Sequence, residues 1–152
     1  LVIEPSQACE TQLFDIEEKD WSERLCKDYG ISMDILPEIA KAGDSLGTIK
    51  KEMADELGIS NDAEFIVGGA DTQIALKSVG MGVGDVAVVS GTTSPVATIT
   101  DYKYYDKQER CWTDSNLGGD TYQVETNPGV TGLNYQKMKA FLFPDTSTVT
   151  CS

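Results

Sequence analysis

The feature that most constrains the fold is a short apolar run followed at once by two glycines and an aspartate, Phe65-Ile66-Val67-Gly68-Gly69-Ala70-Asp71-Thr72-Gln73. The apolar, partly β-branched residues of this run predict a buried strand. The two glycines allow the backbone to turn sharply or to approach another group closely. Apolar residues then recur at helical spacing, at Ile74, Ala75, Leu76 and Val79. The stretch is therefore predicted to be a strand, a tight turn and a helix that begins near Asp71, as in an α/β fold.

Asp71 has two interpretations in this position. Its carboxylate can cap the helix by accepting hydrogen bonds from free backbone amides. It can also face the cleft at the carboxyl end of the strand, where open α/β sheets usually bind ligands. The spacing by itself favours the cap.

A second pattern follows within twenty residues. Residues 85–90 and 95–100 are both strand-like, and Gly91-Thr92-Thr93-Ser94 joins them. A glycine and three hydroxyls in a tight turn can offer N–H and O–H donors to an anion. The same residue types are also common in ordinary hairpin turns, so the turn by itself identifies no ligand.

Taken together, the two patterns resemble the FGGY family of carbohydrate kinases, in which a Gly-Gly-x-Asp-x-Gln segment precedes a Ser-Gly-Thr-Ser-like hairpin. This sequence has Gly68 to Gln73 and then Ser90 to Ser94. Leu13-Phe14-Asp15-Ile16, followed by Asp20-Trp21-Ser22, extends the similarity towards the N-terminus. The resemblance implies a ribonuclease-H-like, actin-like α/β fold. It also implies a central fragment, with residues 1–84 from the end of the N-terminal sugar-binding domain and residues 85–152 from the start of the C-terminal nucleotide-binding domain.

The resemblance further implies ATP-dependent phosphorylation of a sugar or polyol hydroxyl, with ATP and Mg²⁺ and no metal ligands from this chain. Asp71 would be the catalytic base and would bind the substrate hydroxyl. Gln73 would steady Asp71 or touch the sugar, although an exposed helix residue is an equal alternative. The proposed phosphate and nucleotide contacts are Gly91, Thr92 and Thr93, and then Gly129, Gly132 and Asn134.

The charge and composition limit the classes of partner that the chain could bind. The 25 acidic residues against 12 basic ones give a net charge of −13, which argues against nucleic acid and anionic membranes as partners. The four cysteines are scattered and histidine is absent, which fits reduced thiols in a cytoplasmic protein and argues against a zinc site. The sequence is also compatible with a homodimer. The isolated fragment is expected to be inactive, because half of the phosphate clamp and most sugar contacts would lie outside it.

Two other functions remain as alternatives. One is a non-catalytic binding or regulatory module that keeps the actin-like architecture. The other is an unrelated α/β domain in which Asp71 is only a helix cap.

Two helices are predicted to contribute apolar faces to the core. Trp21, Leu25, Cys26 and Tyr29 fall at helical spacing, and Trp21 is interpreted as a core residue. A later segment places Val130, Leu133, Met138, Phe141 and Leu142 on a helical face after Asn127-Pro128-Gly129. The Ser/Thr-rich tail that follows is expected to be frayed.

Overall fold

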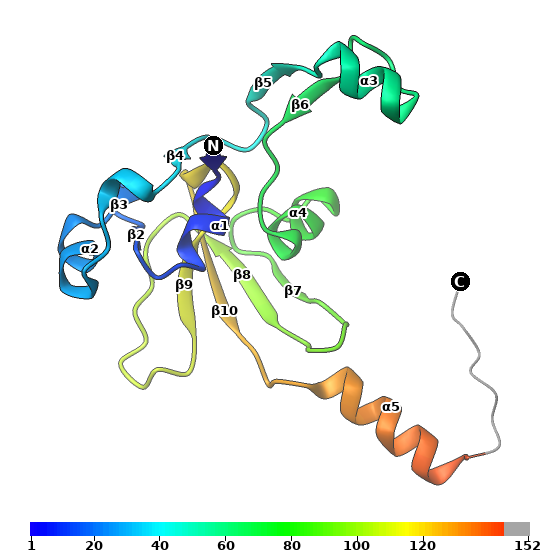
Figure 1. Cartoon of the computed structure of the whole chain (residues 1–152). Coiled ribbons are helices and arrows are strands. Elements are labelled where there is room, and N and C mark those ends of the chain that lie inside the picture. The colour runs from blue at the N-terminus through cyan, green and yellow to red at the C-terminus, as the bar shows by residue number, and fades with distance from the viewer. Residues whose placement is uncertain (145–152) are drawn as a thin grey trace.

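The computed structural model describes residues 1–144, so the tail at 145–152, with Cys151, lies outside the described residues. Short helices and strands alternate in the first half of the chain, and a four-stranded sheet dominates the second half (Figure 1). Within residues 1–144, no helix is long and apolar enough to cross a membrane. The three cysteines in this range, Cys9, Cys26 and Cys111, are free thiols, as the sequence predicts.

The four-stranded sheet is the central element of the molecule. Its strands are β7 (Val86–Val88), β8 (Val96–Thr100), β9 (Trp112–Ser115) and β10 (Tyr122–Thr126). They are ordered β7-β8-β10-β9, and every neighbouring pair is antiparallel. The predicted hairpin is confirmed, because β7 and β8 flank the Gly91–Ser94 turn. A 3₁₀ turn, η2 (Leu117–Gly119), joins β9 to β10.

One face of this sheet packs against the predicted helix. Helix α4 (Asp71–Ser78) begins at the expected position and buries Leu76 against Ala97 and Ile99 of β8, with Met81 beside them. Ala97 and Ile99 are two residues apart, so both point to the same face of the strand. This packing fixes the start of α4 relative to the sheet.

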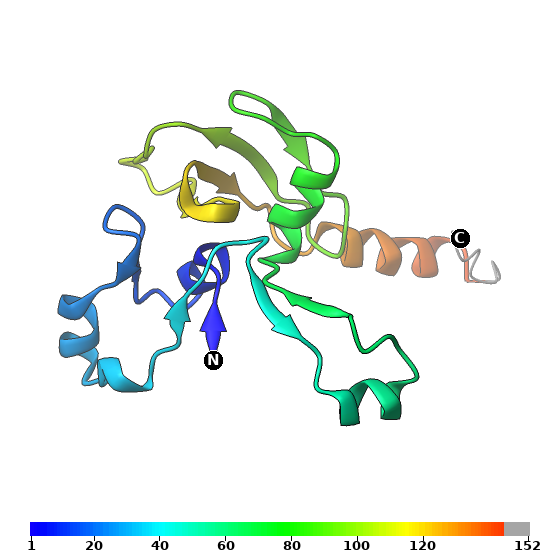
Figure 2. The ribbon, with the colours of Figure 1, turned by 90° about the horizontal axis from the view of Figure 1, so that it is seen from above.

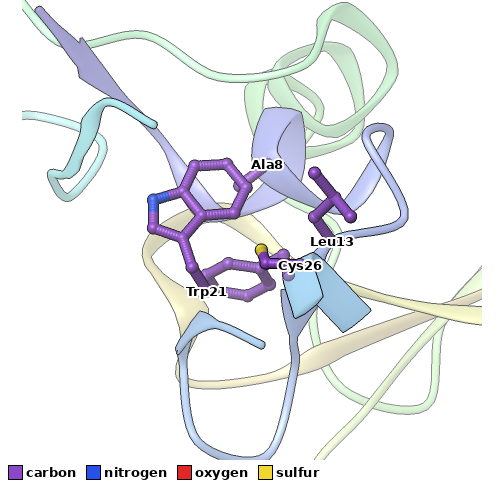
Figure 3. Packing of buried hydrophobic residues seen from close by; sticks show 5 residues of the cluster. Ala8, Leu13, Trp21 and Cys26 are labelled. Atoms are coloured by element: carbon purple, nitrogen blue, oxygen red, sulfur yellow. The ribbon is translucent and has the colours of Figure 1, made fainter. Parts of the chain in front are cut away.

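A second core joins the N-terminal elements. Helix α1 (Pro5–Cys9), strands β2 (Phe14–Asp15) and β3 (Asp20–Trp21), and helix α2 (Glu23–Tyr29) enclose Ala8, Leu13, Trp21 and Cys26 (Figure 3). The rings of Phe14 and Trp21 meet edge to face at 6.1 Å between centroids. Trp21 is thus a core residue, as predicted. Tyr29 is 69% exposed, contrary to the prediction, because the small cluster under α2 extends only as far as Cys26.

A strand-helix-strand segment projects away from the sheet, as both ribbon views show (Figures 1 and 2). It consists of β5 (Ser45–Thr48), α3 (Lys51–Leu57) and β6 (Glu64–Ile66), with β5 and β6 antiparallel. The prediction of a buried strand is wrong for Phe65 and Ile66, which are 57% and 55% exposed. The reason is that β6 pairs only with β5, and no other described element covers it. Val67, just beyond the strand, is buried as expected.

Three short elements and one long helix remain. Strands β1 (Val2–Ile3) and β4 (Glu38–Ile39) form a parallel pair, and η1 (Met33–Ile35) precedes β4. Helix α5 (Thr131–Leu142) follows the Asn-Pro-Gly segment, as predicted. None of its residues is buried, so most of its predicted apolar face is exposed in the described part of the chain.

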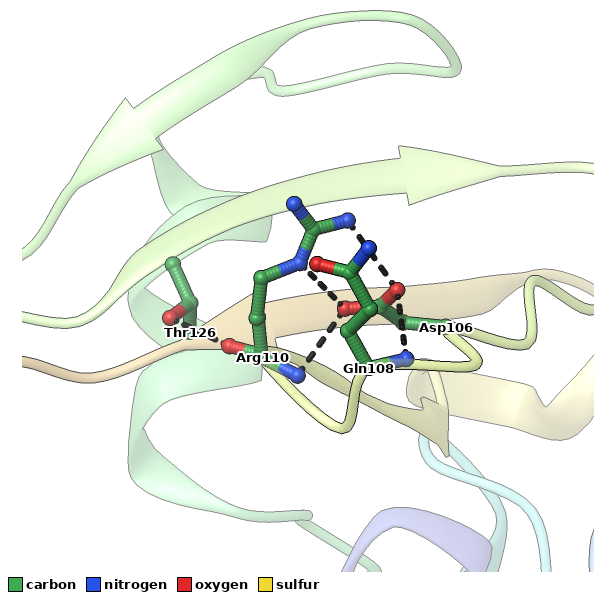
Figure 4. Close-up of polar contacts among 4 residues, drawn as sticks. All are labelled: Asp106, Gln108, Arg110 and Thr126. Atoms are coloured by element: carbon green, nitrogen blue, oxygen red, sulfur yellow. Dashed lines mark hydrogen bonds and ion pairs between the residues drawn. The ribbon is translucent and has the colours of Figure 1, made fainter.

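The loop from β8 to β9 is fixed by one buried carboxylate (Figure 4). Asp106 accepts hydrogen bonds from Nε and Nη2 of Arg110 at 2.9 and 3.1 Å, and from the backbone amides of Gln108 and Arg110. The Arg110 side chain, and then its amide, hold the pKa of Asp106 well below its usual range. Thr126 donates from its hydroxyl to the Arg110 carbonyl, which ties the loop to β10 and sets where β9 begins.

Candidate active site

Asp71 is the first residue of α4, directly after the Gly68-Gly69 turn. Ala70, and not Asp71, occupies the N-cap position. Asp71 Oδ1 accepts a hydrogen bond of 2.6 Å from the amide of Thr72, so one carboxylate oxygen does satisfy a first-turn donor. Among the described residues, no donor reaches Oδ2. The carboxylate therefore stabilises the helix with one oxygen and leaves the other free for a ligand, at the positive end of the helix dipole.

A cavity of about 480 Å³ opens beside Asp71. It is lined by Cys9, Glu10, Gln12, Ala70, Asp71, Thr72, Gln73, Trp112, Asp114 and Glu125. These residues come from the end of α1 and the loop after it, the start of α4 and the strands β9 and β10. The cavity is thus built from segments that lie up to about a hundred residues apart in the sequence.

Gln73 lies in the wall of this cavity. It is only 3% exposed, so the alternative of an exposed helix residue is wrong. Its side-chain oxygen Oε1 is buried and accepts no hydrogen bond within residues 1–144. Because a buried, unsatisfied carbonyl is costly, Gln73 is suited to accept a hydrogen bond from a bound donor.

The cavity carries concentrated negative charge. Burial, with a smaller contribution from Glu10, raises the pKa of Asp114 to about 6. Burial also raises the pKa of Glu125, which accepts a hydrogen bond from Gln123 Nε2. Acceptor groups thus outnumber donors, and the cavity is chemically suited to hydroxyl groups.

Cys9 does not supply a nucleophile to this cavity. Burial, opposed by a hydrogen bond from the Ser115 amide to Sγ at 3.3 Å, raises the pKa of its thiol to about 11. A thiol with this pKa is protonated at neutral pH and unreactive. Its contact with Ser115 instead links the N-terminal segment to β9.

The Gly91–Ser94 turn meets the start of α5. The amides of Gly132 and Leu133 donate to the Thr92 carbonyl at 3.0 and 3.4 Å, and Thr131 donates from its hydroxyl to the Ser94 hydroxyl. Among the described residues, the amides of Thr92 and Thr93 have no acceptor. Two free amides beside two threonine hydroxyls fit the oxygen atoms of a phosphate group.

The structure therefore brings the predicted residues together in two groups. Asp71 and Gln73 share the cavity, while Gly91, Thr92 and Gly132 meet at the turn. The turn contributes no residue to the wall of the cavity, so the two groups remain separate in the described part of the chain. Gly129 adopts φ +83° and bends the chain into α5, and Asn134 lies exposed on that helix.

Sequence reasoning missed the three acidic residues that line the cavity beside Asp71, which are Glu10, Asp114 and Glu125. A signal for two of them was present. Asp114 and Glu125 occupy alternate positions with Trp112 and Gln123 in β9 and β10, and the register places all four on one sheet face. Polar residues repeated on one face of neighbouring strands are a recognisable sign of a polar site.

The arrangement of elements defines a class of protein. Three carbohydrate kinase structures superimpose on 93% or more of this chain and on about 30% of their own length: a ligand-bound xylulose kinase and a gluconate kinase from Lactobacillus acidophilus, and a Plasmodium falciparum glycerol kinase with ADP. The TM-scores are 0.86, 0.83 and 0.80, at 24%, 22% and 20% identity. The fold is thus the actin-like fold of these kinases, as predicted.

The family follows from the sequence. The model of the FGGY family of carbohydrate kinases, N-terminal domain, matches residues 1–78 of the 152, and this chain belongs to that family. YoaC of Bacillus subtilis, which is named as a sugar kinase, is 48% identical over 95% of the chain, and the xylulose kinase of Lactococcus lactis is 37% identical over 64%. The autoinducer-2 kinase of Escherichia coli is 34% identical over 60%. The chain spans only 30%, 21% and 18% of the length of these three relatives.

Proposed function

We propose that this chain is the central part of a longer kinase that transfers the γ-phosphoryl group of ATP to a hydroxyl of a sugar or polyol. The observation that carries the proposal is the position of Asp71. Its free carboxylate oxygen lies at a helix N-terminus beside a polar cavity of about 480 Å³. Membership of the FGGY family supports the same reaction.

Asp71 is the catalytic base of the proposed reaction. The carboxylate orients the attacking hydroxyl and accepts its proton, which is the role of the catalytic base in phosphoryl transfer. Gln73 Oε1 accepts a hydrogen bond from the same substrate. The acidic wall formed by Glu10, Asp114 and Glu125 supplies further acceptors for hydroxyl groups.

The nucleotide is held at the turn. Thr92 and Thr93 bind phosphate oxygens through free amides and hydroxyls, and Gly91, whose amide donates to the Thr93 carbonyl at 3.0 Å, lets the turn approach the phosphate closely. Gly129, Gly132 and Asn134 contact the nucleotide from the start of α5. Among residues 1–144, no group of three His, Cys, Asp or Glu side chains could hold a metal ion. Mg²⁺ would accompany the nucleotide and offset the negative charge of the reacting groups.

The two parts of the chain are assigned to the two domains of such a kinase. Residues 1–84 belong to the sugar-binding domain and residues 85–152 to the nucleotide-binding domain of a cytoplasmic enzyme. Support comes from the family match, which ends at residue 78, and from the four-stranded sheet, whose first strand in the chain is β7. The isolated chain does not turn over, because the curated relatives have more than two thirds of their length outside the matched region.

The test is ATP-dependent phosphorylation by the full-length kinase that contains this segment, over a panel of ketoses, polyols and sugar acids. We expect a phosphorylated product from at least one of them, and no turnover by the 152-residue chain alone. A full-length protein that binds a sugar but phosphorylates nothing on the panel would favour the non-catalytic module. Turnover by the chain alone would contradict the proposal that it is an inactive part of a longer kinase.

A further inference from the structure

Glu4 is a buried carboxylate that accepts hydrogen bonds from three donors and has no positively charged partner among residues 1–144. It is only 3% exposed. Its Oε2 accepts from the amide of Ser6 at 2.8 Å and from the Ser6 hydroxyl, and its Oε1 accepts from the amide of Gly118 at 2.9 Å. A charged group that is removed from water needs such donors, and this set comes from two segments 114 positions apart.

Ser6 connects Glu4 to the backbone that directly precedes Asp71. Its side chain is fully buried, and while its hydroxyl donates to Glu4, its oxygen accepts from the amide of Ala70 at 2.9 Å. A hydroxyl can do both, because it has one donor and two acceptor lone pairs. Ala70 is the N-cap residue of α4 and directly precedes Asp71.

The turn before Asp71 is also packed without spare room. A Cβ placed on Gly69 would lie 2.3 Å from Leu117 Cδ2, 3.0 Å from Glu4 Oε2 and 3.1 Å from Ser6 Oγ. The Gly69-Ala70 backbone is therefore held between the N-terminal segment on one side and η2 on the other. Only glycine permits this approach.

We infer that Glu4 is a positioning residue for Asp71. Through Ser6 it fixes the backbone before the aspartate, and through Gly118 it ties that backbone to the sheet that leads to the proposed nucleotide turn. The inference rests on the proposed function of Asp71. It assigns to Glu4 no contact with either substrate.

The competing explanation is that Glu4 merely caps α1, since its side chain accepts from the Ser6 amide at the start of that helix. Two variants separate the explanations. Ser6→Ala removes the hydroxyl relay but keeps the capped amide. Glu4→Asp keeps a good capping residue, but its side chain is one methylene shorter and cannot reach both Ser6 and Gly118.

The first measurement is hydrogen exchange in the full-length kinase, in the peptide that contains Gly69 and Ala70. We expect both variants to speed exchange there by about tenfold or more, because the turn opens more often. Ser22→Ala serves as the matched control, since it removes a serine hydroxyl that caps α2 and bonds the Leu25 amide. Unchanged exchange in both variants, as capping alone predicts, would overturn the inference whatever the reaction proves to be.

The second measurement separates kcat from KM in the same proteins. A misplaced base lowers kcat by about ten- to a hundredfold and leaves KM for ATP within about twofold. An unchanged kcat in Ser6→Ala and Glu4→Asp, alongside an inactive Asp71→Asn, would reject Glu4 as a positioning residue while the proposed function stands. Full activity in Asp71→Asn would instead reject the proposed function, and with it the role of Glu4 in catalysis.

Discussion

A Cβ atom on Gly132 would lie 2.0 Å from the carbonyl oxygen of Gly91. The first turn of α5 thus rests directly on the backbone of the hairpin that joins β7 to β8, and its Gly132 amide donates to Thr92. This contact is the main one that positions an otherwise exposed helix. It also explains why two segments some forty residues apart form one proposed phosphate site.

Gly132→Ala should separate α5 from the turn. The atoms in the way are backbone, so they cannot move aside cheaply, and overpacking of this kind costs about 1–3 kcal/mol. Urea unfolding would measure the loss, and KM for ATP should rise in the full-length kinase. Gly82→Ala is the control, because its nearest neighbour would be Asp85 Oδ2 at an ordinary 3.8 Å. Equal stability of the two variants would show that the contact is unimportant.

Asp114 should make the protein less stable as the pH rises from about 4 to about 6. Its pKa is raised in the folded state, from 3.8 to about 6, so the folded protein holds a proton that the unfolded chain releases. The stability that this proton confers is complete below about pH 4 and lost above about pH 6. Asp114→Asn should therefore stabilise the protein at pH 7.5 by about 1–2 kcal/mol, a range discounted for the partial exposure of the side chain.

The measurement is the free energy of unfolding of both proteins at pH 4 and pH 7.5. The advantage of Asp114→Asn should shrink at pH 4, where the carboxyl group is neutral in both states. Glu10→Gln should produce a smaller gain at pH 7.5, because Glu10 contributes less than burial to the raised pKa of Asp114. A pH-independent difference between Asp114→Asn and the wild type would contradict this account.

Trp21→Phe should destabilise the N-terminal core by about 1–3 kcal/mol, because the smaller ring leaves a space in the core and cannot form the hydrogen bond of the indole. The indole N–H of Trp21 donates to the Pro37 carbonyl at 2.8 Å and ties β3 to the segment before β4. Tyr29→Leu is the comparison, since this exposed residue should change stability by less than about 0.5 kcal/mol. The measurement is the midpoint of thermal unfolding, followed by circular dichroism, and equal midpoints of the two variants would show that Trp21 contributes no more to stability than Tyr29.

The sequence predicts the local elements well, because local patterns encode them. The Gly68-Gly69 turn, the start of α4 and the β7–β8 hairpin all follow from the spacing of apolar residues and turn residues. For these elements the determining contacts lie within a few residues. The burial of Trp21 is also predicted correctly, but the helical spacing puts it on a helix, whereas the structure places it in β3, before α2.

The rest depends on contacts between distant segments. Nothing near Glu4 reveals that its carboxylate meets Gly118, and nothing near Gln73 reveals that the side chain is buried. Phe65 and Tyr29 look like core residues in sequence, yet the described part of the chain places nothing over them. Burial depends on what packs against a residue, which periodicity does not specify.

The role of Asp71 as the catalytic base is tested by the steady-state kinetics of Asp71→Asn in the full-length kinase, with Asp62→Asn as the control. Asp62 is an exposed aspartate in the same half of the chain, so its substitution makes the same chemical change away from the site. If Asp71 is the base, kcat should fall by about 10²–10⁴-fold with KM for ATP and the unfolding midpoint unchanged, and Asp62→Asn should match the wild type. An Asp71→Asn enzyme that keeps its kcat would contradict the account.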